Sequence, residues 1–126
     1  VSGALRSEIE LVLSRTKLRD HFAVLVSGDD RVLSKPEPDG YLLAVDRLNQ
    51  QFPDLQLHPW ECLVIEDTFS GIEAAKRAGM AVVGVANSYP FHMLQRRANW
   101  TVDYLSDLEL ERVQRVLAGM VEQQAS

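Results

Sequence analysis

The chain has 126 residues, of which 46% are hydrophobic, and its formal net charge is −5 at pH 7. Its charges of both signs are scattered, which argues against a nucleic-acid surface, and no apolar run approaches the roughly 20 residues that span a bilayer. The single cysteine, Cys62, cannot form an internal disulfide. From these features together we expect a cytoplasmic protein that binds neither nucleic acid nor membrane.

Helical and strand patterns alternate along the chain, which is typical of an α/β fold with a parallel sheet. A capping box at Ser7–Glu10 predicts a first helix, and the apolar run Phe22–Val26 predicts a short strand. Further strands are predicted at Cys62–Ile65 and Ala81–Val85, with a brief edge segment at Trp100–Val102. Further helices are predicted over Tyr41–Leu48, from Ser70 to Gly79, over Pro90–Arg97 and after a cap at Ser106. The sequence has no internal repeats and no low-complexity linker, so we predict one incomplete domain.

Two adjacent carboxylates, Glu66 and Asp67, fall where a predicted strand ends and a loop leads into a helix. The pattern Ser70–Glu73 is that of a capping box, so this helix is predicted to start at about Ser70. Ligands of open α/β sheets bind at this edge. Two hard oxygen donors there suit Mg²⁺, which takes one or two protein carboxylates and completes its shell with phosphate and water. Taken alone, the same pair could merely solvate a loop.

A lysine, Lys35, precedes two prolines, Pro36 and Pro38. Each proline pushes its predecessor out of the α region, so Lys35 is predicted to lie in extended, stiffened backbone, and Pro38 suits the first turn of the next helix. Most lysines are simply solvated. Beside a carboxylate pair, however, a fixed ammonium meets the needs of phosphoryl transfer, because Mg²⁺ and a lysine together stabilise the charge on the transferred group.

These two segments resemble motifs of the haloacid dehalogenase-like (HAD) hydrolase superfamily, in its β-phosphoglucomutase-like and phosphoglycolate-phosphatase-like branch. Lys35–Asp39 is similar to the third motif and Glu66–Gly71 to the fourth. Val1–Gly3 resembles the end of the second motif's strand, whose Ser or Thr hydrogen-bonds a phosphoryl oxygen. The resemblance runs from Ser2 to about Leu108 and implies a Rossmann-like three-layer α/β/α fold with a parallel sheet.

Two parts of the family pattern are absent from the sequence. The family's nucleophilic aspartate belongs to a first motif, Asp-x-Asp-x-Thr/Val, which does not occur here, and Asp29-Asp30 has the wrong spacing. The helical cap that this branch inserts between the first and second motifs is also missing. We therefore expect residues 1–126 to be the C-terminal part of a HAD-like core domain, incomplete and not competent alone.

The resemblance also implies roles for individual residues. An upstream aspartate would attack the phosphoryl group to form an aspartyl-phosphate, while Lys35 neutralises the developing charge. Asp67, with Glu66 as a direct or outer partner, would hold Mg²⁺ against the phosphoryl oxygens. Ser2 and the backbone N–H of Gly3 would bind another oxygen. The implied function is a Mg²⁺-dependent phosphatase or phosphomutase for a small phosphorylated metabolite, which this chain does not identify because specificity resides largely in the cap.

The resemblance places the nucleophile strand at the centre of the sheet, whereas this chain supplies only the third, fourth and fifth strands. The fourth strand would then have one unpaired flank, which leaves backbone groups unsatisfied and invites another strand. The missing N-terminal part of the same protein, or another chain, is the partner expected there. The alternative function is a non-catalytic HAD-derived module that binds a partner through this flank. The retained Lys35, Glu66 and Asp67 favour the enzyme, because a binding module has no use for a metal clamp.

Overall fold

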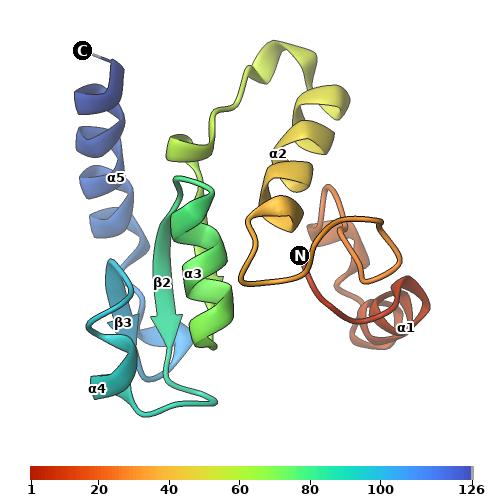
Figure 1. Cartoon of the computed structure of the whole chain (residues 1–126), viewed down its shortest axis with the longest axis horizontal. Coiled ribbons are helices and arrows are strands. Elements are labelled where there is room, and N and C mark those ends of the chain that lie inside the picture. The colour runs from red at the N-terminus through yellow and green to blue at the C-terminus, as the bar shows by residue number, and fades with distance from the viewer. Residues whose placement is uncertain (126) are drawn as a thin grey trace.

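The structure is a computed structural model that describes residues 1–125, and helices alternate with strands along the chain (Figure 1). The α-helices are α1 (Arg6–Thr16), α2 (Asp39–Gln51), α3 (Phe69–Arg77), α4 (Phe91–Leu94) and α5 (Leu110–Ala125). The strands are β1 (Leu63–Glu66), β2 (Ala81–Val85) and β3 (Trp100–Val102). Single 3-10 turns occur at Arg19–His21, Pro53–Leu55, Pro59–Glu61 and Leu105–Asp107. The predicted α/β class is confirmed.

The three strands form one parallel sheet in the order β1-β2-β3. Parallel neighbours need a crossover, and here α3 connects β1 to β2 while α4 lies between β2 and β3. Figure 1 shows α3 and α5 on opposite sides of the strands. The central strand β2 reads as an unbroken apolar run because both of its faces are covered, and Val82 and Val83 are fully buried. The result is a Rossmann-like arrangement with a small sheet.

One core joins α2, α3 and α4 to the sheet. Its most completely buried side chains are Ile72 of α3, Val82 of β2 and Leu94 of α4, and Tyr41 and Val45 of α2 pack into the same cluster. The core therefore anchors α2 against the sheet and fixes the direction in which the first turn of α2 presents its side chains. In residues 1–125, no helix combines the length and the apolar character needed to cross a membrane.

The strand predicted at Phe22–Val26 is wrong. This segment has no regular strand structure, although Leu25 and Val26 are buried. Its neighbour in space is the start of the chain, where the Ser2 N–H donates to the Val26 carbonyl at 2.9 Å and the Gly28 N–H donates to the Ala4 carbonyl at 2.7 Å. A strand requires a partner along its length, and these two isolated bonds do not make a ladder.

The edge of β1 is open among the described residues, because β2 pairs with one side of it and no strand pairs with the other. Ile65, in the middle of β1, is accordingly 47% exposed although it is a large apolar residue. Helix α1, on the far side of this edge in Figure 1, has no buried residue. Its start also differs from the prediction, since Leu5 precedes the helix without a side-chain cap and Ser7 already lies within it.

Candidate functional site

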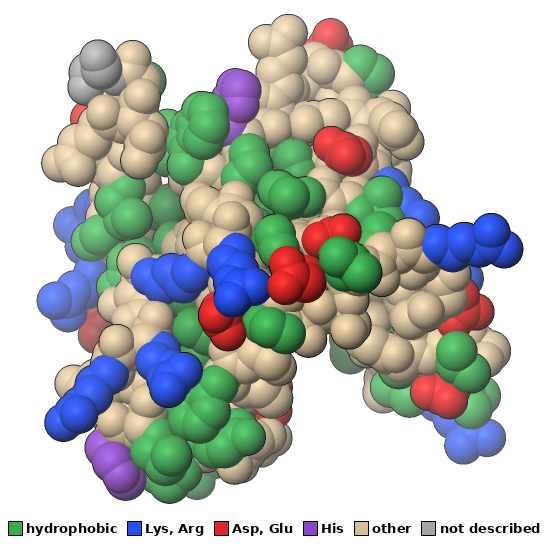
Figure 2. Space-filling model, viewed as in Figure 1, with side chains coloured by type: hydrophobic (Ala, Val, Ile, Leu, Met, Phe, Trp, Pro, Cys, Tyr) green, Lys and Arg blue, Asp and Glu red, His purple; other side chains and the backbone are tan. Residues whose placement is uncertain are grey.

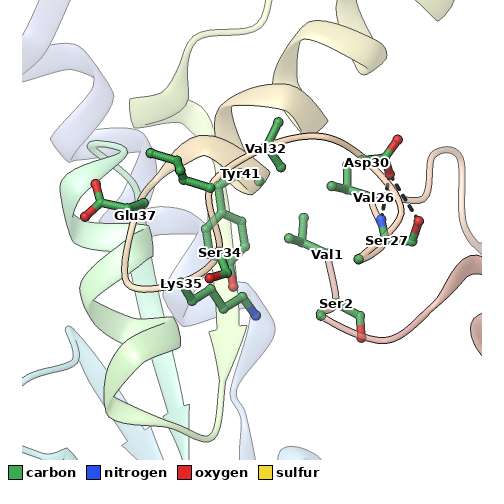
Figure 3. A pocket seen from close by; sticks show the side chains of 14 residues that line it. Val1, Ser2, Val26, Ser27, Asp30, Val32, Ser34, Lys35, Glu37 and Tyr41 are labelled. Atoms are coloured by element: carbon green, nitrogen blue, oxygen red, sulfur yellow. Dashed lines mark hydrogen bonds between the residues drawn. The ribbon is translucent and has the colours of Figure 1, made fainter.

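A cavity of about 290 Å³ opens between the first residues of the chain and the loop that leads into α2. Lys35 and Tyr41 line one wall, and Val1 and Ser2 lie across from them (Figure 3). Gly3 also borders this cavity. The fold therefore brings Lys35, Ser2 and Gly3, which are predicted site residues, around one space.

Glu66 ends β1 with a carboxylate that is only 7% exposed. Lys35 Nζ forms an ion pair with Glu66 Oε1, and the Tyr41 hydroxyl donates a hydrogen bond to the same oxygen. Lys35 Nζ also lies 5.3 Å from the centroid of the Tyr41 ring, within the range of a cation–π contact. A buried carboxylate is costly unless it is paired and hydrogen-bonded, and Glu66 has both kinds of partner.

The glycine in the first turn of α3 makes space for this carboxylate. A Cβ atom placed at Gly71 would overlap the carboxylate group of Glu66. Helix α3 begins at Phe69, because the Thr68 hydroxyl accepts the Gly71 N–H at 3.1 Å. The predicted cap at Ser70 is therefore wrong. Glu73, which would have completed a capping box with Ser70, instead forms an ion pair with Arg77 at 2.7 Å.

The loop that carries Lys35 is held at both of its ends. On one side, the Asp30 carboxylate accepts hydrogen bonds from Arg47 Nη2 at 2.5 Å and from the Ser27 N–H at 2.7 Å. The hydrogen bond from Arg47 is the main cause that lowers the pKa of Asp30 well below its usual range. On the other side, Pro38 precedes α2 and Arg77 pairs with Glu37 at 3.1 Å. The Lys35–Pro36 peptide bond is cis. Figure 2 shows basic and acidic side chains meeting over α3 and the start of α2.

Asp67 follows Glu66, and one of its two carboxylate oxygens accepts a hydrogen bond. Ser88, in the loop after β2, donates its hydroxyl to Asp67 Oδ2 at 2.6 Å. Across the described chain, Asp67 Oδ1 accepts no hydrogen bond, and the Glu66 carboxylate accepts hydrogen bonds at Oε1 alone. Asp67 Oδ1 is therefore open to a further partner, whereas Glu66 Oε2 lies against Gly71.

These two carboxylates fit the coordination preferences of Mg²⁺ in number and kind. Residues 1–125 contain no cluster of three or more His, Cys, Asp or Glu side chains that could hold a metal. Mg²⁺ usually takes one or two protein carboxylates and obtains its other ligands from substrate phosphate and water. Asp67, which is half-buried and has Oδ1 open, is the better placed of the two, since Glu66 Oε1 already receives two donors.

Ser2 lies at the cavity with its hydroxyl turned toward its own backbone. Ser2 Oγ accepts the Ala4 N–H at 3.1 Å, so its O–H is available as a donor to another oxygen. The structure gives neither Ser2 nor Gly3 a hydrogen bond to Lys35 or Glu66. Of the five predicted site residues, Lys35 and Glu66 are therefore in contact, Asp67 is adjacent in sequence, and Ser2 and Gly3 share only the cavity with Lys35.

Sequence reasoning missed two residues of this site, Tyr41 and Ser88. Tyr41 occupies an apolar position of an amphipathic helix, so its pattern gives no signal for a hydroxyl that reaches a carboxylate. Burial, together with the hydrogen bond to Glu66 and its negative charge, raises the pKa of Tyr41 well above its ordinary value. Ser88 could have been found, because it follows β2 at the edge of the sheet where ligand-binding side chains gather.

The chain is similar to one family model and to several known proteins. A family model described as haloacid dehalogenase-like hydrolase matches residues 1–79. The bifunctional riboflavin kinase/FMN phosphatase of Arabidopsis thaliana is 33% identical over 112 residues, which cover 88% of this chain and 28% of that protein. The β-phosphoglucomutase of Bacillus subtilis is 37% identical over 100 residues, which cover 79% of this chain and 39% of that enzyme.

A solved structure gives the same result for the fold. The β-phosphoglucomutase of Clostridium difficile superposes with a TM-score of 0.73 and 28% sequence identity, over 88% of this chain and 45% of that chain. The chain thus spans less than half the length of each of these three relatives.

Proposed function

Because this chain belongs to the haloacid dehalogenase-like hydrolase family, we propose that it is part of a Mg²⁺-dependent phosphatase or phosphomutase. Its substrate would be a small phosphorylated metabolite, and the reaction would pass through an aspartyl-phosphate. The observation that carries this proposal is the Lys35 ammonium paired with the buried Glu66 carboxylate, next to Asp67, at the carboxyl end of β1. Residues 1–126 would form the C-terminal part of the core domain.

Lys35 would stabilise the transferred phosphoryl group. Phosphoryl transfer spreads negative charge over the three non-bridging oxygens, so a cation that is already in place lowers the barrier without reorganising during the reaction. Glu66 holds the Lys35 ammonium at the cavity, and Lys35 in turn compensates the charge of Glu66. The Ser2 hydroxyl and the Gly3 N–H, on the facing wall, would donate hydrogen bonds to another phosphoryl oxygen.

Asp67 and Glu66 would hold the metal. When bound, Mg²⁺ supplies positive charge to the phosphoryl oxygens and orients them. Asp67 would offer Oδ1, while Ser88 fixes the carboxylate by its hydrogen bond to Oδ2. Glu66 would act directly or through water. The nucleophilic aspartate would come from outside residues 1–126, since the chain has no Asp-x-Asp-x-Thr/Val motif.

The test is phosphate release by the natural full-length protein from a panel of phosphate monoesters that includes FMN and hexose phosphates, with and without Mg²⁺. We expect release from at least one small metabolite, its loss on chelation with EDTA, and its recovery when Mg²⁺ is restored. A mutase would convert a hexose phosphate without net release, so sugar products are followed in parallel. A protein that transforms none of the panel at any Mg²⁺ concentration would contradict the proposal. A cytoplasmic location is proposed with it, because such charged metabolites do not cross membranes unaided.

The open edge of β1 favours a second function, a non-catalytic module that binds a partner strand. We propose that this edge pairs with an N-terminal part of the same protein or with another chain. Unpaired strand edges with apolar side chains such as Ile65 invite pairing.

Residues 1–126 produced alone are therefore expected to self-associate or to melt without a sharp transition. Size-exclusion chromatography with light scattering, and circular dichroism on heating, test this expectation. A monomer with one steep cooperative melt would show that the edge needs no partner. Partner binding combined with loss of all phosphate chemistry in the full-length protein would select the module over the enzyme.

A further inference from the structure

We propose that Tyr41 is a positioning residue that fixes the Lys35 ammonium by sharing the carboxylate of Glu66. The proposal rests on the proposed phosphoryl chemistry and adds to it a residue that contacts neither metal nor nucleophile. It follows from three interactions within one buried cluster, two of which end on the same oxygen atom.

The first step is the geometry at Glu66. Both Lys35 Nζ and the Tyr41 hydroxyl are bonded to Oε1, and both Tyr41 and Glu66 are buried. A carboxylate oxygen can accept two donors, so the lysine and the tyrosine occupy it together rather than in competition. Lys35 Nζ lies 5.3 Å from the Tyr41 ring centroid, so the phenol contacts the ammonium as well as the carboxylate. Figure 3 shows the two side chains on the same wall of the cavity.

The second step is the difference in rigidity between the two donors. Lys35 extends from a loop, whereas Tyr41 belongs to the first turn of α2 and packs in the core with Val45 and Ile72. The Tyr41 hydroxyl is therefore held by the helix and the core, while the lysine side chain has several free torsions. The Glu66 carboxylate already fills the space beside Gly71, so the first turn of α3 packs against it there. Without the Tyr41 hydroxyl, the carboxylate loses the donor that the core holds in place, and the Lys35 ammonium can shift with it.

The third step is that the phenol donates in one fixed direction. The Tyr41 ring packs in the core and its hydroxyl donates to Oε1, so this oxygen is held by a group that cannot turn freely. A small displacement of a group near the reacting atoms lowers the reaction rate strongly. Losing this restraint should therefore lower kcat.

The test uses Tyr41→Phe in the full-length protein, because phenylalanine keeps the packed ring and removes only the hydroxyl. We expect kcat to fall about tenfold with KM nearly unchanged, since the ammonium is displaced rather than removed. The matched control is Tyr104→Phe, which deletes the hydroxyl of a side chain that is 71% exposed and should leave both constants unchanged. An unaltered kcat in Tyr41→Phe would overturn the proposal.

A double-mutant cycle separates positioning from a general loss of structure. If Tyr41 acts through Lys35, adding Tyr41→Phe to Lys35→Met should cost nothing further, whereas an independent structural role would produce the same tenfold loss again. The second outcome would overturn the proposal.

A chemical readout makes the inference testable even if the protein shows no phosphate chemistry. Acylation of the Lys35 amine by acetic anhydride, followed by mass spectrometry, should be about threefold faster in Tyr41→Phe than in the parent, in line with the net strength of one hydrogen bond. The rate in Tyr104→Phe should match the parent. Equal rates in all three proteins would overturn the positioning role, while a silent substrate panel with faster labelling would overturn only the proposed function.

Discussion

Lys35→Met in the full-length protein is expected to lower kcat by about 10²–10³, the loss typical of removing one preorganised electrostatic stabiliser. Methionine has nearly the length of lysine and no charge, so the change deletes the ammonium and little else. Because Lys35 would act mainly on the charge of the transition state, KM should change much less than kcat. Steady-state kinetics with the best substrate of the panel measure both constants. A variant that keeps activity within about threefold of the parent would exclude Lys35 from the proposed role.

The same substitution also removes the cation paired with a buried carboxylate, so activity and stability must be separated. Losing one partner of a buried pair is destabilising because the remaining charge is uncompensated. Adding Glu66→Gln to Lys35→Met neutralises that charge, and the Tyr41 hydroxyl can still donate to the amide oxygen. We expect the double variant to recover melting temperature without recovering kcat. Lys17→Met, the same change at an exposed lysine in the turn after α1, is the matched control and should affect neither.

The parts of the fold that the sequence predicts well are those governed by local pattern. The run Ala81–Val85 is apolar throughout because it is the central strand of a parallel sheet covered on both faces, and its predicted bounds are confirmed. Gly79 adopts a φ of +81°, the left-handed conformation that favours glycine after a helix, so the predicted end of α3 is also confirmed. Both signals depend on near neighbours in the chain.

The wrong predictions concern patterns that are compatible with more than one structure. Phe22–Val26 has the composition of a strand but lacks a partner along its length, and composition alone does not supply one. The cap of α3 is Thr68, which lies before the Ser70–Glu73 pattern and accepts the Gly71 N–H, while Glu73 pairs with Arg77. In each case the local pattern was compatible with two structures, and a contact outside the pattern decided between them.

The candidate site likewise has a contact that the sequence predicts and another that it does not. The meeting of Lys35 with Glu66 could be predicted because two motifs carried it, and the structure places these side chains in contact. Tyr41 could not be predicted, because its role requires the register of α2 against the end of β1. The roles assigned to all five residues stay predictions, and the structure gives Ser2, Gly3 and Asp67 no hydrogen bond to Lys35.

Asp67→Asn is expected to abolish the Mg²⁺-dependent activity and to lower metal affinity by about 10²-fold or more, since even outer partners of metal ligands cost 10–100-fold when removed. Asparagine keeps an oxygen that can accept the Ser88 hydroxyl, so the loop after β2 should stay in place while the negative charge is lost. Isothermal titration with MgCl₂ measures affinity directly, and activity against Mg²⁺ concentration measures its catalytic consequence.

Asp54→Asn is the matched control for this prediction, because it removes a carboxylate from an exposed 3-10 turn remote in sequence from the site. It should bind Mg²⁺ as the parent does. If Asp67→Asn also retained the parental affinity, the metal would have to be held by Glu66 and by groups outside residues 1–126. If affinity fell but activity did not, Mg²⁺ would be structural rather than part of the reaction. Only a joint loss of binding and turnover, confined to Asp67→Asn, agrees with a metal that Asp67 presents to the phosphoryl group.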